Sequence, residues 1–279
     1  MEFKYYPAPA KLNLMLHIVG RREDGMHLLQ TVFQFLDYCD EIGFSLRADG
    51  KVKRITDVPG LPAEKDLVVQ AAKLLAQHID NFPGVDIDIR KQIPMGGGLG
   101  GGSSDAATVL LVLNSLCKNQ LSVEQLAEAG LQLGADVPFF VRGFACWAEG
   151  VGEKIQPVEL REPWFVVLDP GVHVSTAEVF SHSDLTRSSP LTTIAAFLEG
   201  GGRNDCEPVV RKQYPEIASA MQWLSEFSPA KLTGTGACVF AEFGTHEQAL
   251  SVFKQIPEEY KGFIARGLNR SPLLDLLKI

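Results

Sequence analysis

Hydrophobic and polar positions alternate along the chain with two different periods, and each period predicts a different kind of element. Residues 11–19 have a period of two, which predicts a strand with one buried face and with Lys11 and Asn13 on the opposite face. A polar turn and a second strand, LQTVFQFL, follow. Further strands are expected over 40–46 and 85–89. The helical spacing of residues 66–79 predicts a helix with Asp66 as its cap.

Mixed elements continue along the chain. Ser122 and Gln125 form a capping box for a helix over 123–133, and the GADVPFF segment places Asp136 between the end of that helix and an expected apolar strand. Later strands and helices alternate without the regularity of a doubly wound sheet, which favours an α+β fold. The charged, proline-bearing segment 153–163 predicts a boundary between two domains, residues 1–157 and 158–279.

Composition and charge narrow the class of protein. The chain has 279 residues, 46% of them apolar, and a net charge of −8, which argues against nucleic-acid binding through clustered cations. It shows neither a bilayer-length apolar run nor a secretion signal, so we expect a cytoplasmic protein without a membrane or an obligatory protein partner. Five widely spaced cysteines, none in C-x-x-C, indicate neither a disulfide framework nor a zinc site.

Candidate chemistry concentrates in residues 93–107, which read IPMGGGLGGGSSDAA. Six glycines allow successive backbone N–H groups to turn inward and approach a ligand closely. An apolar run typical of a buried helix follows, and the N-terminus of a helix favours an anion. The segment therefore predicts a phosphate site, which we call the phosphate loop.

Other interpretations of the phosphate loop are a long turn, a dinucleotide fingerprint or a P-loop. Gly96, Gly98 and Gly101 satisfy G-x-G-x-x-G, but a helical pattern stands where the second strand of a βαβ unit should follow. The P-loop pattern fails because Ser103, and no lysine, follows the last glycine.

The loop resembles the phosphate-binding signature of the galactokinase, homoserine kinase, mevalonate kinase and phosphomevalonate kinase superfamily. Three other segments, PAPAKLNLMLHIVGRREDGMHLLQT, GADVPFFVRG and LTGTGACVFAEF, are similar to the 4-diphosphocytidyl-2-C-methyl-D-erythritol kinase family within it. The resemblance covers about residues 7–272. It implies an N-terminal ribosomal-S5-like nucleotide domain and a C-terminal ferredoxin-like substrate domain.

The resemblance also implies roles for individual residues. Asp136 would be the general base and Lys11 its cationic neighbour, which would neutralise charge on the transferred phosphoryl group. Thr233 and Thr235 would support the site. The residues implied for ATP are Pro94, Met95, Gly96, Gly97, Gly98, Leu99, Gly100, Gly101, Gly102, Ser103 and Ser104, and those for the acceptor are Asn13, Met26, His27 and Phe180.

Mg²⁺ would accompany ATP, with the hydroxyl of Ser103 or Ser104 as a ligand. The chain departs from the family pattern at two positions: Met26 stands where a tyrosine is usual beside the cytosine, and Asp66 stands where an asparagine is usual near the adenine. Asp66 cannot donate a hydrogen bond as an amide can, so a role as helix cap is the better interpretation.

The activity implied is transfer of the γ-phosphoryl group of ATP to the 2-hydroxyl of 4-diphosphocytidyl-2-C-methyl-D-erythritol, a step of non-mevalonate isoprenoid biosynthesis. Alternatives are a superfamily kinase for another alcohol such as homoserine or mevalonate, a non-catalytic nucleotide-binding regulator, and a dinucleotide oxidoreductase. The KLNL and DGMH segments disfavour the first, and the combination of Lys11 with Asp136 disfavours the second.

Overall fold

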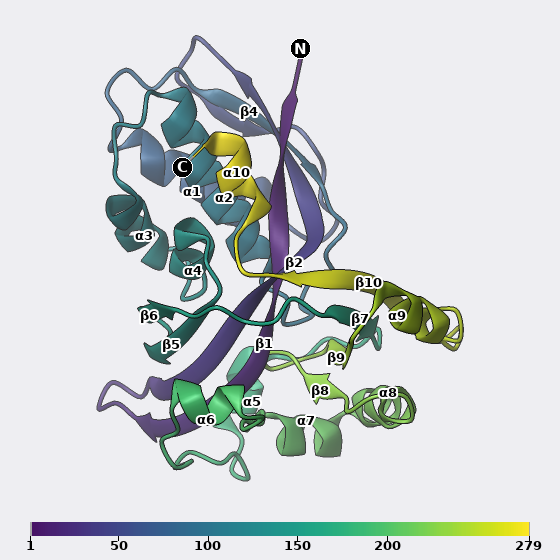
Figure 1. Cartoon of the computed structure of the whole chain (residues 1–279). Coiled ribbons are helices and arrows are strands. Elements are labelled where there is room, and N and C mark those ends of the chain that lie inside the picture. The colour runs from purple at the N-terminus through teal and green to yellow at the C-terminus, as the bar shows by residue number, and fades with distance from the viewer. Residues whose placement is uncertain (1, 279) are drawn as a thin grey trace.

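Two long antiparallel strands form the axis of the molecule (Figure 1). The computed structural model describes residues 2–278, and within it β1 spans Lys4–Arg21 and β2 spans His27–Leu46. The expected separate strand over 40–46 is therefore wrong, because β2 continues without a break. The polar residues that interrupt its apolar pattern accept hydrogen bonds from neighbouring segments: Asp37 from the backbone N–H of Arg266, and Asp40 from that of Ile93.

The prediction that β1 has one buried face is also wrong, because residues on both of its faces are buried. Lys11 and Asn13 are only 3% and 4% exposed. Sequence alternation cannot detect this burial, which is imposed by distant segments covering the predicted polar face. In addition, the pairing register with β2 shifts between Asn13 and Met15. This bulge changes the phase of the strand, so Leu16 lies on the cavity side with Asn13.

The N-terminal part packs helices against these strands. Strands β3 (Val52–Arg54) and β4 (Val85–Arg90) extend the sheet beside β2, and β5 (Cys146–Gly150) and β6 (Lys154–Pro157) pair at its other end. The helical elements are η1 (Ala63–Lys65), α1 (Leu67–Ala76), α2 (Gly101–Leu116), α3 (Val123–Leu131) and α4 (Val137–Arg142). The capping box of Ser122 and Gln125 is confirmed.

Helix α4 corrects the prediction of an apolar strand after Asp136. Its first five residues, VPFFV, are all buried, so the segment has no polar face from which a helical period could be read. Pro138 is compatible with the first turn of a helix, where its missing N–H would have no partner within the helix.

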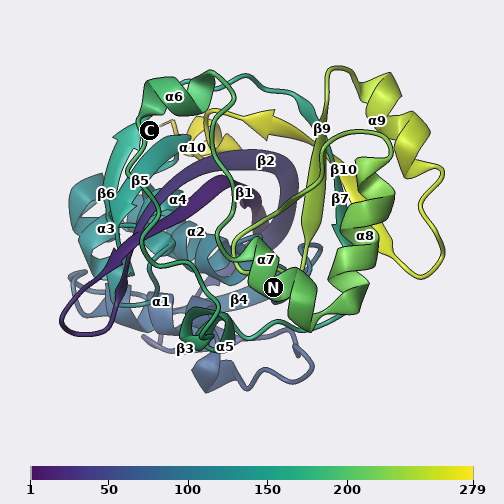
Figure 2. The ribbon, with the colours of Figure 1, turned by 90° about the horizontal axis from the view of Figure 1, so that it is seen from below.

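The strands of the C-terminal part form an antiparallel continuation of the same sheet (Figure 2). Strand β7 (Trp164–Asp169) lies between β9 (Val239–Phe243) and β10 (Lys261–Leu268), with β8 (Lys231–Leu232) pairing to β9. The helices of this part are α5 (Thr176–Ser181), α6 (Ile194–Leu198), α7 (Glu207–Gln213), α8 (Pro215–Ser225) and α9 (His246–Phe253).

The end of the chain returns to the N-terminal part. Strand β10 pairs with β2 at Gly267 and Leu268, and α10 (Pro272–Leu277) then places Leu273 and Leu274 in the hydrophobic core formed around α1 and α2. The architecture is the mixed α+β fold predicted. The boundary at residue 157 stays a prediction. Between residues 2 and 278, no helix is long and apolar enough to span a membrane.

Candidate active site

The phosphate loop lies between β4 and α2 and ends as the first turn of that helix. Gly96, Gly98 and Gly100 have φ values of +74°, +75° and +73°, a region that favours glycine. Gly100 is the N-cap, and α2 begins at Gly101. The loop is fixed to the central strand, since the backbone N–H of Lys11 donates to the carbonyl oxygen of Leu99 at 2.9 Å.

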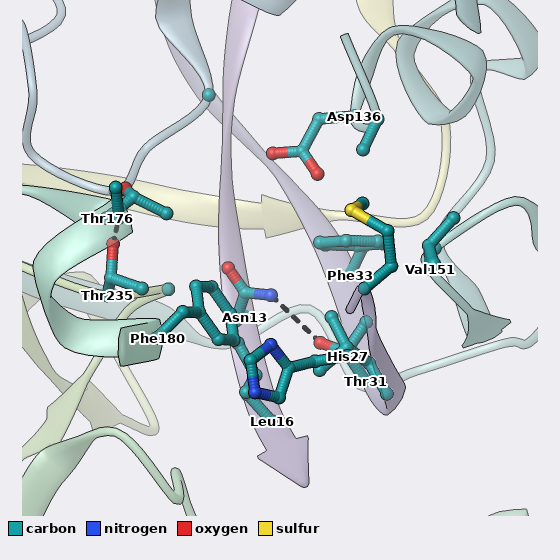
Figure 3. Close-up of a pocket in the computed structure, with 18 of the residues that line it drawn as sticks. Asn13, Leu16, His27, Thr31, Phe33, Asp136, Val151, Thr176, Phe180 and Thr235 are labelled. Atoms are coloured by element: carbon teal, nitrogen blue, oxygen red, sulfur yellow. Dashed lines mark hydrogen bonds between the residues drawn. The ribbon is translucent and has the colours of Figure 1, made fainter. Parts of the chain in front are cut away.

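Two cavities meet at this loop. The smaller, about 400 Å³, is lined by residues 94–103, by Asp66 and Leu67 at the start of α1, and by Lys91. The larger, about 720 Å³, opens on the other side of the loop between β1, β2, α4 and α5 (Figure 3). Gly98, Gly100 and Ser103 line both cavities. A group held by the loop in the smaller cavity therefore faces the larger one.

Lys11 and Asp136 face each other at this junction. The Nζ atom of Lys11 lies 3.6 Å from an Oδ atom of Asp136, and it donates to the side-chain oxygen of Asn13 and, at 3.0 Å, to the carbonyl oxygen of Gly98. Strand β1 supplies the lysine, whereas Asp136 is the N-cap residue of α4, with its side chain about one-third exposed. The arrangement brings a cation and an accessible carboxylate to one point in the cavity.

Burial shifts the protonation equilibrium of Lys11. Removal of the ammonium from water lowers the pKa of Lys11 below its ordinary value, and the negative charge of Asp136 opposes part of this effect. The side chain lies against the face of Phe33, with Nζ 5.3 Å from the ring centre.

The TGTGA segment supports the loop from the C-terminal part. Thr233 Oγ1 accepts the backbone N–H of Asn13 at 3.0 Å and donates to the carbonyl oxygen of Gly98 at 3.2 Å. Thr235 exchanges a hydrogen bond of 2.9 Å with Thr176, at the first turn of α5. These threonines thus join β1, the phosphate loop and α5 around the larger cavity.

The far end of the larger cavity is aromatic. The rings of His27 and Phe180 lie 5.0 Å apart with an interplanar angle of 30° (Figure 3). Arg187 Nε lies 3.2 Å from Nε2 of His27, and burial lowers the pKa of His27, with further lowering by the charges of Arg187 and Arg21. Met26 lines the same end but is half exposed.

Asp66 is confirmed as a helix cap. One carboxylate oxygen accepts the backbone N–H of Val68 at 3.0 Å, and the other pairs with Arg54 at 2.6 Å. Both oxygens are thus engaged, and the residue is buried. This arrangement accounts for an acidic residue at this position.

The structure separates the two candidate serines. Ser103 lines both cavities, whereas Ser104 is buried, and its Oγ has no hydrogen-bond partner among the described residues. Leu99 points its side chain into the core, so only its backbone is available to a ligand. The other residues predicted to bind ATP, Pro94 to Gly102, line the smaller cavity. No cluster of three metal-ligating His, Cys, Asp or Glu side chains occurs between residues 2 and 278.

Sequence reasoning missed several residues of the larger cavity. Phe33 and Thr31 come from β2, where they continue an ordinary strand pattern, and Arg187 comes from a polar segment after α5. No local motif marks these residues as part of a site. Only the pairing of β1 with β2 brings Thr31 to Asn13, whose amide donates to its hydroxyl at 2.8 Å.

Comparison with known proteins identifies the family. Residues 66–144 match the GHMP kinases N terminal domain and residues 184–262 match the GHMP kinases C terminal domain. A 4-diphosphocytidyl-2-C-methyl-D-erythritol kinase of Nitrosococcus oceani is 56% identical over 273 residues, covering 98% of each chain. The chain belongs to the 4-diphosphocytidyl-2-C-methyl-D-erythritol kinase family. The resemblance of the four motifs is thereby confirmed.

Solved structures agree with this family assignment. A crystal structure of 4-(cytidine 5'-diphospho)-2C-methyl-D-erythritol kinase superposes with a TM-score of 0.85 at 29% identity, covering 95% of this chain and 99% of that one. A mevalonate kinase superposes with a TM-score of 0.68 at 14% identity, covering 96% and 100%, and shows the shared fold alone. The GHMP kinase fold is thus confirmed.

Proposed function

We propose that the protein transfers the γ-phosphoryl group of ATP to the 2-hydroxyl of 4-diphosphocytidyl-2-C-methyl-D-erythritol. One observation carries this proposal: a glycine loop at a helix N-terminus lines two cavities at once, and Lys11 and Asp136 stand at their junction. Phosphoryl transfer needs a phosphate held between a nucleotide and an acceptor hydroxyl, with charge neutralised at the transfer point. The family relationship supports the choice of substrates.

Asp136 is the proposed general base. Its carboxylate is partly exposed and makes no cap hydrogen bond to α4. It can therefore accept the proton of an acceptor hydroxyl in the larger cavity. Lys11 is proposed to stabilise the negative charges of both this carboxylate and the transferred phosphoryl group. The ammonium is held in place by Asn13 and Gly98, so it needs little rearrangement during the reaction.

The phosphate loop is proposed to bind the phosphates of ATP in the smaller cavity. Its backbone N–H groups and the first turn of α2 suit an anion. The Ser103 hydroxyl could hold the Mg²⁺ ion that would accompany ATP, because it supplies an oxygen ligand at the point where both cavities meet. The ion would neutralise phosphate charge and orient the transferred group.

The aromatic end of the larger cavity is proposed to bind cytosine, with His27 at its edge and Phe180 against its face. Met26 lies at the mouth of this pocket and offers a polarisable side chain where the family usually has a tyrosine. Asn13 and Thr31 line the path from the base to the reacting hydroxyl.

Coupled ADP release from the purified protein tests this function. With ATP and Mg²⁺, we expect turnover of the cytidyl substrate and none of homoserine or mevalonate, and ³¹P coupling in the product should place the new phosphate on the 2-hydroxyl. Turnover of another alcohol alone would retain a kinase but remove the cytidine pocket. No turnover of any acceptor, with ATP still bound, would favour a nucleotide-binding regulator.

A further inference from the structure

We propose that Arg187 is a positioning residue that fixes the tautomer of His27, so that Nδ1 of this histidine presents an N–H donor to the substrate base. The inference rests on the proposed function, because it concerns how the aromatic end of the larger cavity recognises cytosine. The observation behind it is the hydrogen bond of 3.2 Å from Arg187 Nε to His27 Nε2.

The hydrogen bond determines where the histidine proton lies. A guanidinium carries only N–H donors and stays charged, so the histidine nitrogen that it contacts must act as the acceptor. A neutral imidazole has one acceptor nitrogen and one N–H, which places the proton on Nδ1. Burial and the charges of Arg187 and Arg21 oppose a second proton, because they lower the pKa of His27.

The other contacts of Arg187 hold it in one orientation. Its Nη2 atom donates to the carbonyl oxygens of Phe180 and His182 at 2.9 and 2.8 Å, and Nη1 donates to that of Leu185 at 3.1 Å. The guanidinium therefore ties the C-terminal end of α5 to the first residue of β2. One side chain sets both the position of Phe180 and the protonated nitrogen of His27.

A fixed donor has a consequence for base selection. Among the described residues, no hydrogen bond reaches Nδ1 of His27, which lines the larger cavity. The N3 atom of cytosine accepts a hydrogen bond, whereas N3 of uracil carries a proton and donates one. A ring nitrogen locked as a donor thus favours cytosine over uracil at this edge, and an imidazole free to change tautomer would discriminate less.

Long-range ¹⁵N–¹H NMR of histidine-labelled protein tests the tautomer without any substrate, with His27→Gln to assign the signal. We expect a protonated Nδ1 and an unprotonated Nε2 in the wild type at neutral pH. In Arg187→Gln we expect both tautomers and a higher His27 pKa. Arg211→Gln is the matched control, since this arginine is exposed on α7 and pairs with Glu207. A wild-type His27 protonated on Nε2, or charged at neutral pH, would overturn the inference.

Kinetics with the cytidyl substrate and its uridyl analogue test the consequence. In Arg187→Gln we expect KM for the cytidyl substrate to rise and the cytidyl-to-uridyl ratio of kcat/KM to fall by about tenfold, with kcat and KM for ATP within about twofold. Arg187→Lys, which keeps the charge and a carbonyl contact, serves if the glutamine variant does not fold. An unchanged ratio in a variant whose His27 tautomer has changed would refute the assignment. If no protein turns over either substrate, the proposed function fails, and the NMR result alone decides the tautomer.

Discussion

At the scale of single residues, burial and partners decide which polar groups are available for chemistry. Lys11 is buried but held by Asn13, Gly98 and Asp136, whereas both oxygens of the Asp66 carboxylate are engaged by Val68 and Arg54. Asp136 and Asp66 both line a cavity, but they differ in what they can do there. Asp136 keeps an accessible carboxylate, and Asp66 has none to offer.

Replacing Asp136 with asparagine removes the proposed base without changing the shape of the site. We expect kcat to fall by roughly 10²–10⁴-fold, the usual contribution of a general base, with ATP affinity retained. Steady-state kinetics and nucleotide titration measure the two effects. Asp80→Asn is the control, since it removes the same charge from an exposed position after α1. Unchanged turnover in Asp136→Asn would exclude this residue from the reaction.

The protonation of Lys11 predicts how activity depends on pH. The ammonium form is the one that stabilises transferred charge, so activity should fall as pH rises through the pKa of Lys11, which burial places below that of an ordinary lysine. Asp136 raises this pKa, so in Asp136→Asn the alkaline limb of the remaining activity should move to lower pH. A pH profile of kcat for both proteins measures the shift. A shift of the alkaline limb to higher pH in Asp136→Asn would contradict the pairing of Lys11 with Asp136.

At the scale of elements, the phosphate loop depends on a backbone that other segments approach closely. At Gly98 an added Cβ would overlap the carbonyl oxygen of Thr233, and at Gly97 it would lie 2.5 Å from the sulfur of Cys238. The TGTGAC segment is therefore packed directly on the loop. This close approach is a second reason, besides φ, for the number of glycines in the loop.

The substitution Gly98→Ala combines a φ of +75° with that overlap, so we expect the loop to shift and kcat/KM for ATP to fall on the order of 10²-fold. Gly171→Ala is the matched control, because its φ is +74° and nothing lies within 4 Å of the added Cβ. Gly171→Ala introduces a similar backbone strain without any steric overlap of the new Cβ. Equal losses of activity in both variants would show that backbone strain alone matters.

The elements also show which features the sequence could predict. The phosphate loop with α2, the caps of α1 and α3, and the strand that carries Lys11 and Asn13 follow from local signals and were predicted. Helix α4 and the bulge before Met15 could not be, because uniform burial hides the period of the first and pairing with a distant strand causes the second. Arg187 was missed for a similar reason, since its partners are distant or backbone atoms.

At the scale of the whole molecule, β1 and β2 bring the N-terminal and C-terminal parts together at one site. The smaller cavity belongs to the N-terminal part, and the larger one is closed by α5 and the TGTGA segment from the C-terminal part. Strand β10 pairs with both β2 and β7, so the N-terminal and C-terminal parts share a continuous sheet (Figure 1). The geometry at the junction depends on this connection as much as on the residues that line it.

A substitution in helix α10 tests whether the N-terminal and C-terminal parts unfold together. Leu274 is 3% exposed and packs in the core around α1 and α2, so Leu274→Ala should lower the free energy of unfolding by about 2–5 kcal/mol. Leu276→Ala, at a position 59% exposed on the same helix, should change it by less than about 0.5 kcal/mol. Because the shared sheet couples the two parts, we expect denaturant unfolding followed at Trp147 and at Trp223, each retained as the single tryptophan, to shift together. A shift confined to Trp147 would show instead that the N-terminal part unfolds on its own.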